Sequence, residues 1–235
     1  MIEEPKRLRI ARHRPRPDPA HVAALAAHPT GFVLDAMYGA GAMDARIKPL
    51  PGLPGRLCGP VLTVGNRPGD ILASLAALEV IEAGQVLVAA FDGHAGCAAG
   101  GDRLVGMLRN AGGAGFVTDG PMRDLAGLAD VGLPVFCAGL TPGSPVVAGP
   151  GTVGLPVVLG GVAVETGDVV VADADGVVVV PGRMVPAVAA AVDRVARAEA
   201  ALDAEVAAGR ASVDAIRAML EGDDVEWVEP DPAAP

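Results

Sequence analysis

Three charged residues stand close together in an otherwise apolar stretch of the chain. The segment GFVTDGPMRDLAGL, Gly115 to Leu128, contains Asp119, Arg123 and Asp124. Its first residues are typical of a strand, and helix signals resume at Arg123 or Asp124. In open α/β sheets, ligands bind beyond the carboxyl ends of strands, where helix N-termini present unpaired N–H groups. The segment is therefore a candidate for a site that binds both an anion and a cation.

The preceding unit of the chain repeats this arrangement. The strand signal QVLVAAF leads through a glycine-rich loop to Asp102, which can cap a helix whose first amides belong to Arg103 and Leu104. If the two strands are neighbours, both helix starts converge on one crevice that also contains Arg123 and Asp124. On spacing alone, the commoner situation stays open: Asp102 and Asp124 are ordinary helix caps and Arg123 is an ordinary surface charge.

Histidine and lysine usage restricts the chemistry. His94 is the one histidine away from the N-terminal region, so no histidine cluster for zinc can be built. Any metal would be held by carboxylate oxygens and water, which favours Mg²⁺ or Mn²⁺. Lys6 and Lys48 are the only lysines, which leaves a Schiff-base mechanism almost without a nucleophile. Carbonyl chemistry in this chain would need a metal.

The composition favours one compact domain with an acidic surface. The 235 residues are 51% hydrophobic and carry a formal net charge of -10, which argues against nucleic-acid or anionic-membrane partners. The basic segment Lys6 to Pro17 lacks the apolar core of a secretory signal, so we expect a solvated arm and a cytoplasmic protein. The three cysteines show no CxxC spacing and suggest neither a disulfide framework nor a zinc site.

Periodicity predicts a mixed α/β fold. A helix capped by Asp18 and a second one starting near Thr30 come first, and strands then alternate with short helices from residue 56 to 139. Two valine runs around residues 173–176 predict an antiparallel hairpin. From Met184 to about Leu220 the chain is helical with a break at Gly209, and an acidic, proline-rich tail follows.

Five separated motifs resemble those of a known family. They are GPVLTV (59–64), GD (69–70), TDGPMRD (118–124), LPVFCAGLTP (133–142) and GDVVVADADGVVVVP (167–181). In this order they resemble the RraA-like family, which includes the 4-hydroxy-4-methyl-2-oxoglutarate / 4-carboxy-4-hydroxy-2-oxoadipate aldolases. The resemblance covers roughly residues 20 to 210.

The resemblance implies a role for each residue of the crevice. Arg123 would grip the carboxylate of pyruvate, and Asp124 would bind the divalent metal directly. Asp102 would hold metal-bound waters, and the amides of Arg103 and Leu104 would receive the pyruvate carboxylate. Arg103 itself departs from the family, whose aldolases commonly have an apolar residue there.

The resemblance also implies a three-layer β/β/α sandwich with a mixed sheet and a C-terminal helical extension, assembled as a homotrimer or hexamer. Glu199, on the C-terminal helix, aligns with a glutamate that reaches the metal's water shell from a neighbouring subunit. We expect a basic flexible arm (1–19), a catalytic domain (20–182), helices that pack on a neighbouring subunit (183–222) and an acidic tail (223–235).

The expected activity is that of a divalent-metal-dependent pyruvate aldolase. A small 2-oxo acid, 4-hydroxy-4-methyl-2-oxoglutarate or a related 4-hydroxy compound, would be cleaved to pyruvate with Mg²⁺ or Mn²⁺ as cofactor. Oxaloacetate decarboxylation passes through the same enolate, so both activities are expected. The alternative is a catalytically idle protein that regulates a ribonuclease by protein contact, as some members of the family do.

Overall fold

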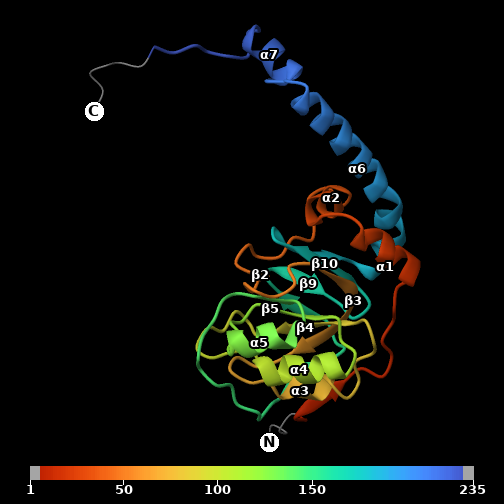
Figure 1. The fold of residues 1–235 in the computed structure, drawn as a ribbon, viewed down its shortest axis with the longest axis vertical. Helices are drawn as coiled ribbons and strands as arrows, with labels where there is room; N and C mark the ends of the chain where they lie inside the picture. Colours follow the sequence, from red (N-terminus) through yellow and green to blue (C-terminus); the bar gives the residue numbers. More distant parts are fainter. Residues whose placement is uncertain (1–5, 230–235) are drawn as a thin grey trace, which may run out of the picture. The chain divides into compact units, whose positions relative to one another are not determined.

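The computed structural model describes residues 6–229, and within this range nine strands form one mixed sheet (Figure 1). The strands of this sheet are β1 (Leu8–Ile10), β2 (Lys48–Pro49), β3 (Leu57–Gly65), β4 (Val86–Ala90), β5 (Gly115–Thr118), β6 (Val135–Cys137), β7 (Gly151–Val153), β10 (Val169–Asp173) and β11 (Gly176–Val180). A separate hairpin consists of β8 (Val157–Leu159) and β9 (Val162–Val164). The helices are α1 (Pro19–Ala26), α2 (Thr30–Asp35), α3 (Leu72–Ala77), α4 (Asp102–Asn110), α5 (Leu125–Val131), α6 (Val185–Ala207) and α7 (Asp214–Leu220).

The centre of the sheet is parallel. Strands β3, β4, β5 and β6 lie side by side in this order and run in the same direction. In the register of β4 with β5, Ala89 lies opposite Thr118, so the two strands end at the same edge. This pairing confirms the expectation that the loops before α4 and α5 converge.

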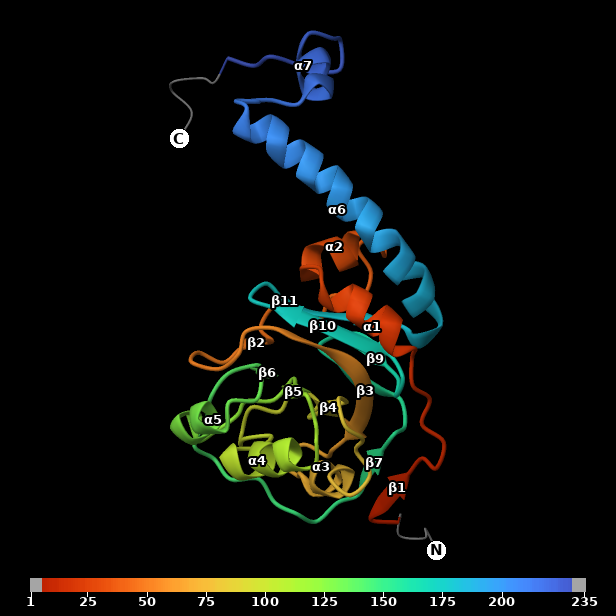
Figure 2. The same cartoon turned by 45° about the vertical axis from the view of Figure 1, so that its right-hand side comes forward.

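Strand β3 belongs to two pairings along its length. Its first half, Leu57 to Pro60, pairs antiparallel with β10, and its second half, Val61 to Gly65, pairs with β4. The β10–β11 hairpin, whose turn Asp173 and Gly176 flank, is the one expected from the two valine runs. Strand β3 therefore carries the chain from a second β layer into the parallel centre of the sheet (Figure 2).

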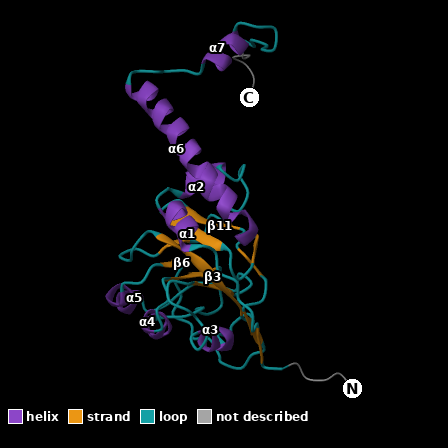
Figure 3. Ribbon diagram, turned by 90° about the vertical axis from the view of Figure 1, so that its right-hand side faces the viewer, coloured by secondary structure: helices purple, strands orange, loops and turns teal. Residues whose placement is uncertain are grey.

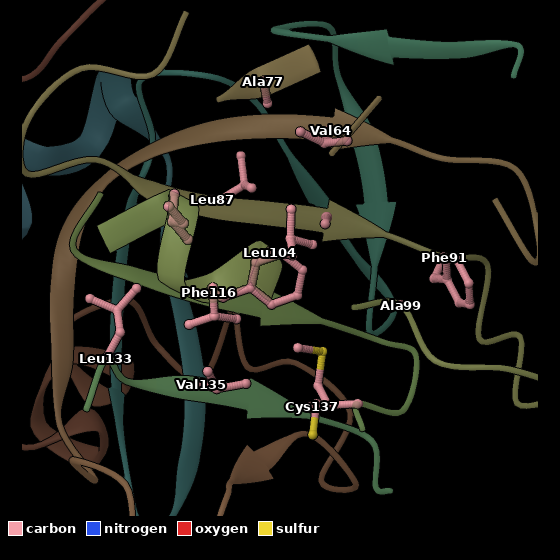
Figure 4. Packing of buried hydrophobic residues seen from close by; sticks show 14 of the residues in the cluster. Val64, Ala77, Leu87, Phe91, Ala99, Leu104, Phe116, Leu133, Val135 and Cys137 are labelled. Atoms are coloured by element: carbon pink, nitrogen blue, oxygen red, sulfur yellow. The ribbon is translucent and has the colours of Figure 1, made fainter. Parts of the chain in front are cut away.

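Apolar side chains hold these layers together. Helices α3, α4 and α5 cover one face of the parallel strands, and Figure 4 shows Leu104 of α4 packed near Leu87 and Phe116 of the sheet. On the opposite face, Val88 and Phe136 pack in a second cluster with residues of β8, β9, β10 and β11. The expected three-layer β/β/α arrangement is thus confirmed.

A third apolar cluster lies outside the β10–β11 hairpin. Leu25 of α1, Val33 of α2 and Val188 of α6 pack there against Val169 and Val178 of the hairpin. Figure 3 shows α1 and α2 on the side of this hairpin away from α3, α4 and α5. The fold therefore adds a helical cover to its three central layers.

Part of the expected flexible arm is a strand, so that expectation is wrong for Leu8–Ile10. These residues form β1 and pair in parallel with β7, where Leu8 lies opposite Gly151. The physical reason is that the edge of β7 exposes unpaired backbone groups, which an extended segment of almost any composition satisfies. Residues 1–5 and 230–235, parts of the expected arm and tail, lie outside the described residues.

The chain from Arg197 onward forms a second compact unit, which contains the end of α6 and all of α7. In this unit Arg210 forms an ion pair with Glu205, and Arg217 donates a hydrogen bond to the Ser212 hydroxyl over 2.5 Å. The expected packing of these helices on a neighbouring subunit stays a prediction. Within residues 6–229, every helix is too short or too polar to cross a bilayer.

Candidate active site

The loop between β5 and α5 is anchored by Asp119. Asp119 Oδ1 accepts a hydrogen bond from the Phe91 N–H over 2.6 Å, and Oδ2 accepts one from Gly93 over 2.9 Å. Burial raises the pKa of Asp119 above its ordinary value, although both N–H donors favour the ionised form. Asp119 therefore connects the β4–α4 loop to the end of β5 through two hydrogen bonds.

Arg123 and Asp124 complete the loop with an unusual backbone. Asp124 precedes α5 in the left-handed conformation, with φ 61° and ψ 45°, and its side chain makes no capping hydrogen bond. A non-glycine residue held in this region costs about 1–3 kcal/mol. Asp124 Oδ2 instead faces Arg123 Nε at 3.1 Å. Asp124 therefore occupies the N-cap position of α5 but is not an ordinary cap, because its carboxylate bonds to a cation and to none of the helix amides.

The start of α4 differs from the expected one. Gly101, in extended conformation, occupies the N-cap position, so Asp102 is the first helical residue and not the cap. Asp102 Oδ1 accepts a hydrogen bond from the Arg103 N–H over 2.7 Å. Because Asp102 already engages this amide, a ligand that uses it would have to share it with the carboxylate. The Leu104 amide follows in the same first turn, where the helix offers its N–H groups no partner.

Two glycines make room for the two carboxylates. A Cβ atom at Gly101 would overlap with Asp124 Oδ2, and one at Gly127 would overlap with Asp102 Oδ2. Both glycines have φ values that other residues also adopt, so backbone conformation does not demand them. Each glycine lies in close contact with an acidic side chain, which a methyl group at that position would have to displace.

Five of the six residues expected in the site line one hollow of about 120 Å³. These are Asp102, Arg103, Leu104, Arg123 and Asp124, and apolar side chains from α3, α4 and the loop after β6 form the opposite wall. A second hollow of about 340 Å³ on the other side of Arg123 and Asp124 is lined by Leu125, Leu140, Thr141 and Pro142. Glu199, the sixth residue, belongs to the second unit, and its role stays a prediction.

A larger hollow of about 440 Å³ lies elsewhere, beside Pro15 and Gly182. Its buried carboxylate, Asp168, accepts hydrogen bonds from the backbone of Glu165 and Gly182, one on each oxygen. Because these bonds satisfy both oxygens, Asp168 fixes a turn and is a poor candidate for catalysis. The smaller hollow, which Asp102, Arg123 and Asp124 line, is the better candidate for the active site.

The donor set of the hollow fits a hard divalent cation. Within residues 6–229, no three His, Cys, Asp or Glu side chains gather as ligands. Asp124 is 42% exposed and has one oxygen on Arg123, and the space beside its carboxylate is kept open by Gly101. One carboxylate with open space around it suits Mg²⁺ or Mn²⁺, which keep several waters. Asp102 lies across the same hollow and could hold such waters.

Sequence reasoning missed Ser144. Its hydroxyl accepts a hydrogen bond from Arg123 Nη1 over 2.5 Å, from a loop 21 residues further along the chain. The surrounding sequence, TPGSPVV, is typical of a turn and carries no chemical signal. Only the fold of this loop against the β5–α5 connection brings the serine to the arginine.

Comparison with protein families gives one match that includes both the central strands and the motifs of the site. The model of the RraA-like family, described as Aldolase/RraA, matches residues 30–179, which include all the strands from β3 to β10. The chain belongs to the RraA-like family. The matched range includes the five residues of the hollow and ends before Glu199.

Relatives of this RraA-like chain carry names of different kinds. A protein of Halalkalibacterium halodurans named "Putative 4-hydroxy-4-methyl-2-oxoglutarate aldolase" is 38% identical over 153 residues, 65% of this chain and 72% of the relative. Streptomyces coelicolor RraAS2, described as an unusual member of an RNase ES inhibitor family, is 30% identical with a TM-score of 0.69 over 81% of this chain and 98% of that one. The RNA-processing inhibitor RraA of Thermus thermophilis is 30% identical with a TM-score of 0.59, over 66% and 93%.

Proposed function

We propose that this chain is a divalent-metal-dependent pyruvate aldolase that also decarboxylates oxaloacetate. One observation carries the proposal: Asp124 is held in a strained conformation with its carboxylate free of helix capping, beside Arg123 and in the same hollow as Asp102. Strained residues cluster at functional sites, because the surrounding structure must over-determine them. The aldolase name of a relative at 38% identity supports the same reading.

Arg123 would bind the carboxylate of the 2-oxo acid. Its side chain is one-third exposed, and the residue lines both hollows, so it is open to a substrate. An arginine presents donors in a planar fork that matches a carboxylate. The N-terminal end of α4, with the Leu104 amide, adds partial positive charge on the other side of the hollow.

Asp124 would hold Mg²⁺ or Mn²⁺, with Asp102 bound to its waters. When bound, the cation supplies a Lewis acid for the negative charge that develops on the 2-oxo group. In the aldolase reaction the 4-hydroxyl group would lose its proton, the bond between C3 and C4 would break as C4 becomes the carbonyl carbon of the second product, and C3 would take up a proton to give pyruvate. Asp102, through water, would accept the first proton and return one to C3.

The test is a pyruvate-release assay on purified protein. Oxaloacetate and 4-hydroxy-4-methyl-2-oxoglutarate are supplied separately, with Mg²⁺, with Mn²⁺ and with EDTA. We expect both substrates to release pyruvate with either metal and neither to do so in EDTA. Full turnover in EDTA would refute the metal mechanism, and no turnover with either substrate under any condition would refute the aldolase.

A second candidate is a catalytically idle regulator of ribonuclease activity. The similarity to two structures described as RNase or RNA-processing inhibitors favours it. It predicts that the protein slows RNA cleavage by an RNase E-type enzyme, and that Asp124→Asn does so equally well. An inhibitory protein without pyruvate release would establish this function in place of the aldolase.

A further inference from the structure

The guanidinium of Arg123 is held at two of its three nitrogens. Nε faces Asp124 Oδ2 at 3.1 Å, and Nη1 donates to the Ser144 hydroxyl over 2.5 Å. The backbone of Arg123 is also fixed, because its N–H donates to the Gly100 carbonyl oxygen over 3.1 Å. Asp124 is adjacent in the chain, whereas Ser144 comes from a separate loop and acts as the second fixed point.

The loop that carries Ser144 is rigidly attached to the body of the fold. Asp70 Oδ2 accepts hydrogen bonds from the N–H groups of Ala148 and Gly149, both over 2.7 Å. Val146 donates to the Gly69 carbonyl oxygen over 2.8 Å and accepts from the Ile71 N–H over 3.0 Å. The buried Asp70 carboxylate and a short backbone ladder therefore hold the residues that follow Ser144 in this loop, from Val146 to Gly149.

This attachment determines how Arg123 can meet an anion. A guanidinium has five N–H donors and no acceptor, and two of the five are used by Asp124 and Ser144. Three donors take no part in these bonds, one on Nη1 and both on Nη2, and they are the ones left for a substrate carboxylate. An unrestrained arginine side chain would lose conformational entropy on binding a substrate. The bonds to Asp124 and Ser144 already restrict the side chain before the substrate binds, so less entropy is lost.

We propose that Ser144 is a positioning residue that orients the Arg123 guanidinium for the carboxylate of the 2-oxo acid. The inference rests on the proposed function, since it assigns a substrate contact to Arg123. Ser144 itself does not bind the metal or the reacting atoms, so its loss should weaken substrate binding far more than it lowers the rate at saturation. A threonine, which keeps the hydroxyl, should restore the contact.

The experiment compares Ser144→Ala and Ser144→Thr with wild type in three measurements. The first is KM and kcat for oxaloacetate with saturating Mg²⁺, and the second is the Kd of oxalate by calorimetry. The third is the NMR order parameter of the Arg123 Nε–H group, whose signal is assigned by its loss in Arg123→Lys. Ser212→Ala is the matched control, because it removes an arginine–serine hydrogen bond of the same length in the second unit.

For Ser144→Ala we expect KM and the oxalate Kd to rise about tenfold, as for the loss of one hydrogen bond to a charged group, with kcat changed less than about twofold. The Arg123 order parameter should fall, while Ser144→Thr and Ser212→Ala keep wild-type values. Unchanged KM and order parameter in Ser144→Ala would overturn the inference. If the wild-type protein neither releases pyruvate nor binds oxalate, the proposed function is refuted, and so is the substrate contact of Arg123. In that case the Arg123 order parameter alone shows whether Ser144 holds the guanidinium in place.

Discussion

Gly101 lies directly against the carboxylate of Asp124, across the gap between the two loops that follow β4 and β5. A side chain at Gly101 would occupy the position of Asp124 Oδ2 and crowd the Arg123 side chain. The Asp124 carboxylate therefore keeps its position only while Gly101 has no Cβ atom. The backbone conformation of Gly101 is one that other residues adopt, so the site and not the helix accounts for this glycine.

We therefore predict that Gly101→Ala lowers pyruvate release at least tenfold while the protein stays folded. The new methyl group must displace the Asp124 carboxylate, and small misplacements of reacting groups cost about a hundredfold in rate. Gly106→Ala, inside α4, is the control, because its Cβ would make only an ordinary contact with Val131 of α5. There, alanine should raise the stability of the protein by roughly 0.5–1 kcal/mol. Equal activity of the two variants in the pyruvate assay would contradict this reading of the site.

Asp124→Asn should abolish metal-dependent pyruvate release. The neutral amide removes the charge of the proposed direct ligand, and hard cations prefer carboxylate oxygens. The matched control is Asp130→Asn on the exposed side of the same helix, which should keep full activity. Mg²⁺ titration of the decarboxylase rate distinguishes the two, and an unchanged Mg²⁺ midpoint in Asp124→Asn would remove this residue from the metal site.

Asp70 should give the fold a pH-dependent stability. Burial raises its pKa, but hydrogen bonds from three backbone N–H groups, of Leu72, Ala148 and Gly149, outweigh this effect and hold the pKa below its ordinary value. The ionised form is thus favoured by folding, and its contribution is present at neutral pH and lost as the pH falls through the lowered pKa.

Accordingly, Asp70→Asn should lower the free energy of unfolding at pH 7 by about 1–3 kcal/mol, the range for a buried polar group that loses partners. Urea denaturation between pH 7 and pH 3 measures this difference, which should shrink toward the acidic end. A difference that stays constant over the whole range would show that the charge of Asp70 is not involved.

Glu199→Ala tests whether each site is completed by a neighbouring subunit. We expect the oligomer mass from light scattering and the Tm to stay nearly unchanged, whereas Mg²⁺ activation weakens about 10–100-fold, as for residues that hold metal-bound water. Asp203→Ala, an exposed carboxylate on the same helix, is the control and should behave as wild type. A monomeric wild type with full activity would argue against a shared site.

Local patterns in the sequence predicted the alternating strands and helices of the α/β part and pointed to Asp102 and Asp124 as candidate site residues. Alternation of short strands and helices indicates parallel pairing, so Asp102 and Asp124 were expected in one crevice if β4 and β5 were neighbours, and the structure shows that these strands are paired. The reason is that hydrophobic periodicity and glycine positions are local properties that can be read directly from the sequence.

Tertiary structure decided the contacts between distant segments. Strand β1 pairs with the edge of β7, and the Ser144 hydroxyl accepts a hydrogen bond from Arg123. Both contacts depend on backbone groups and loop positions that residue types do not encode. The cap of α4 is Gly101 and not Asp102, and a Cβ atom at Gly101 would overlap with the Asp124 carboxylate of the neighbouring loop. A hydrogen bond between segments becomes favourable only after folding has placed both partners, and this is why the sequence alone was silent on these positions.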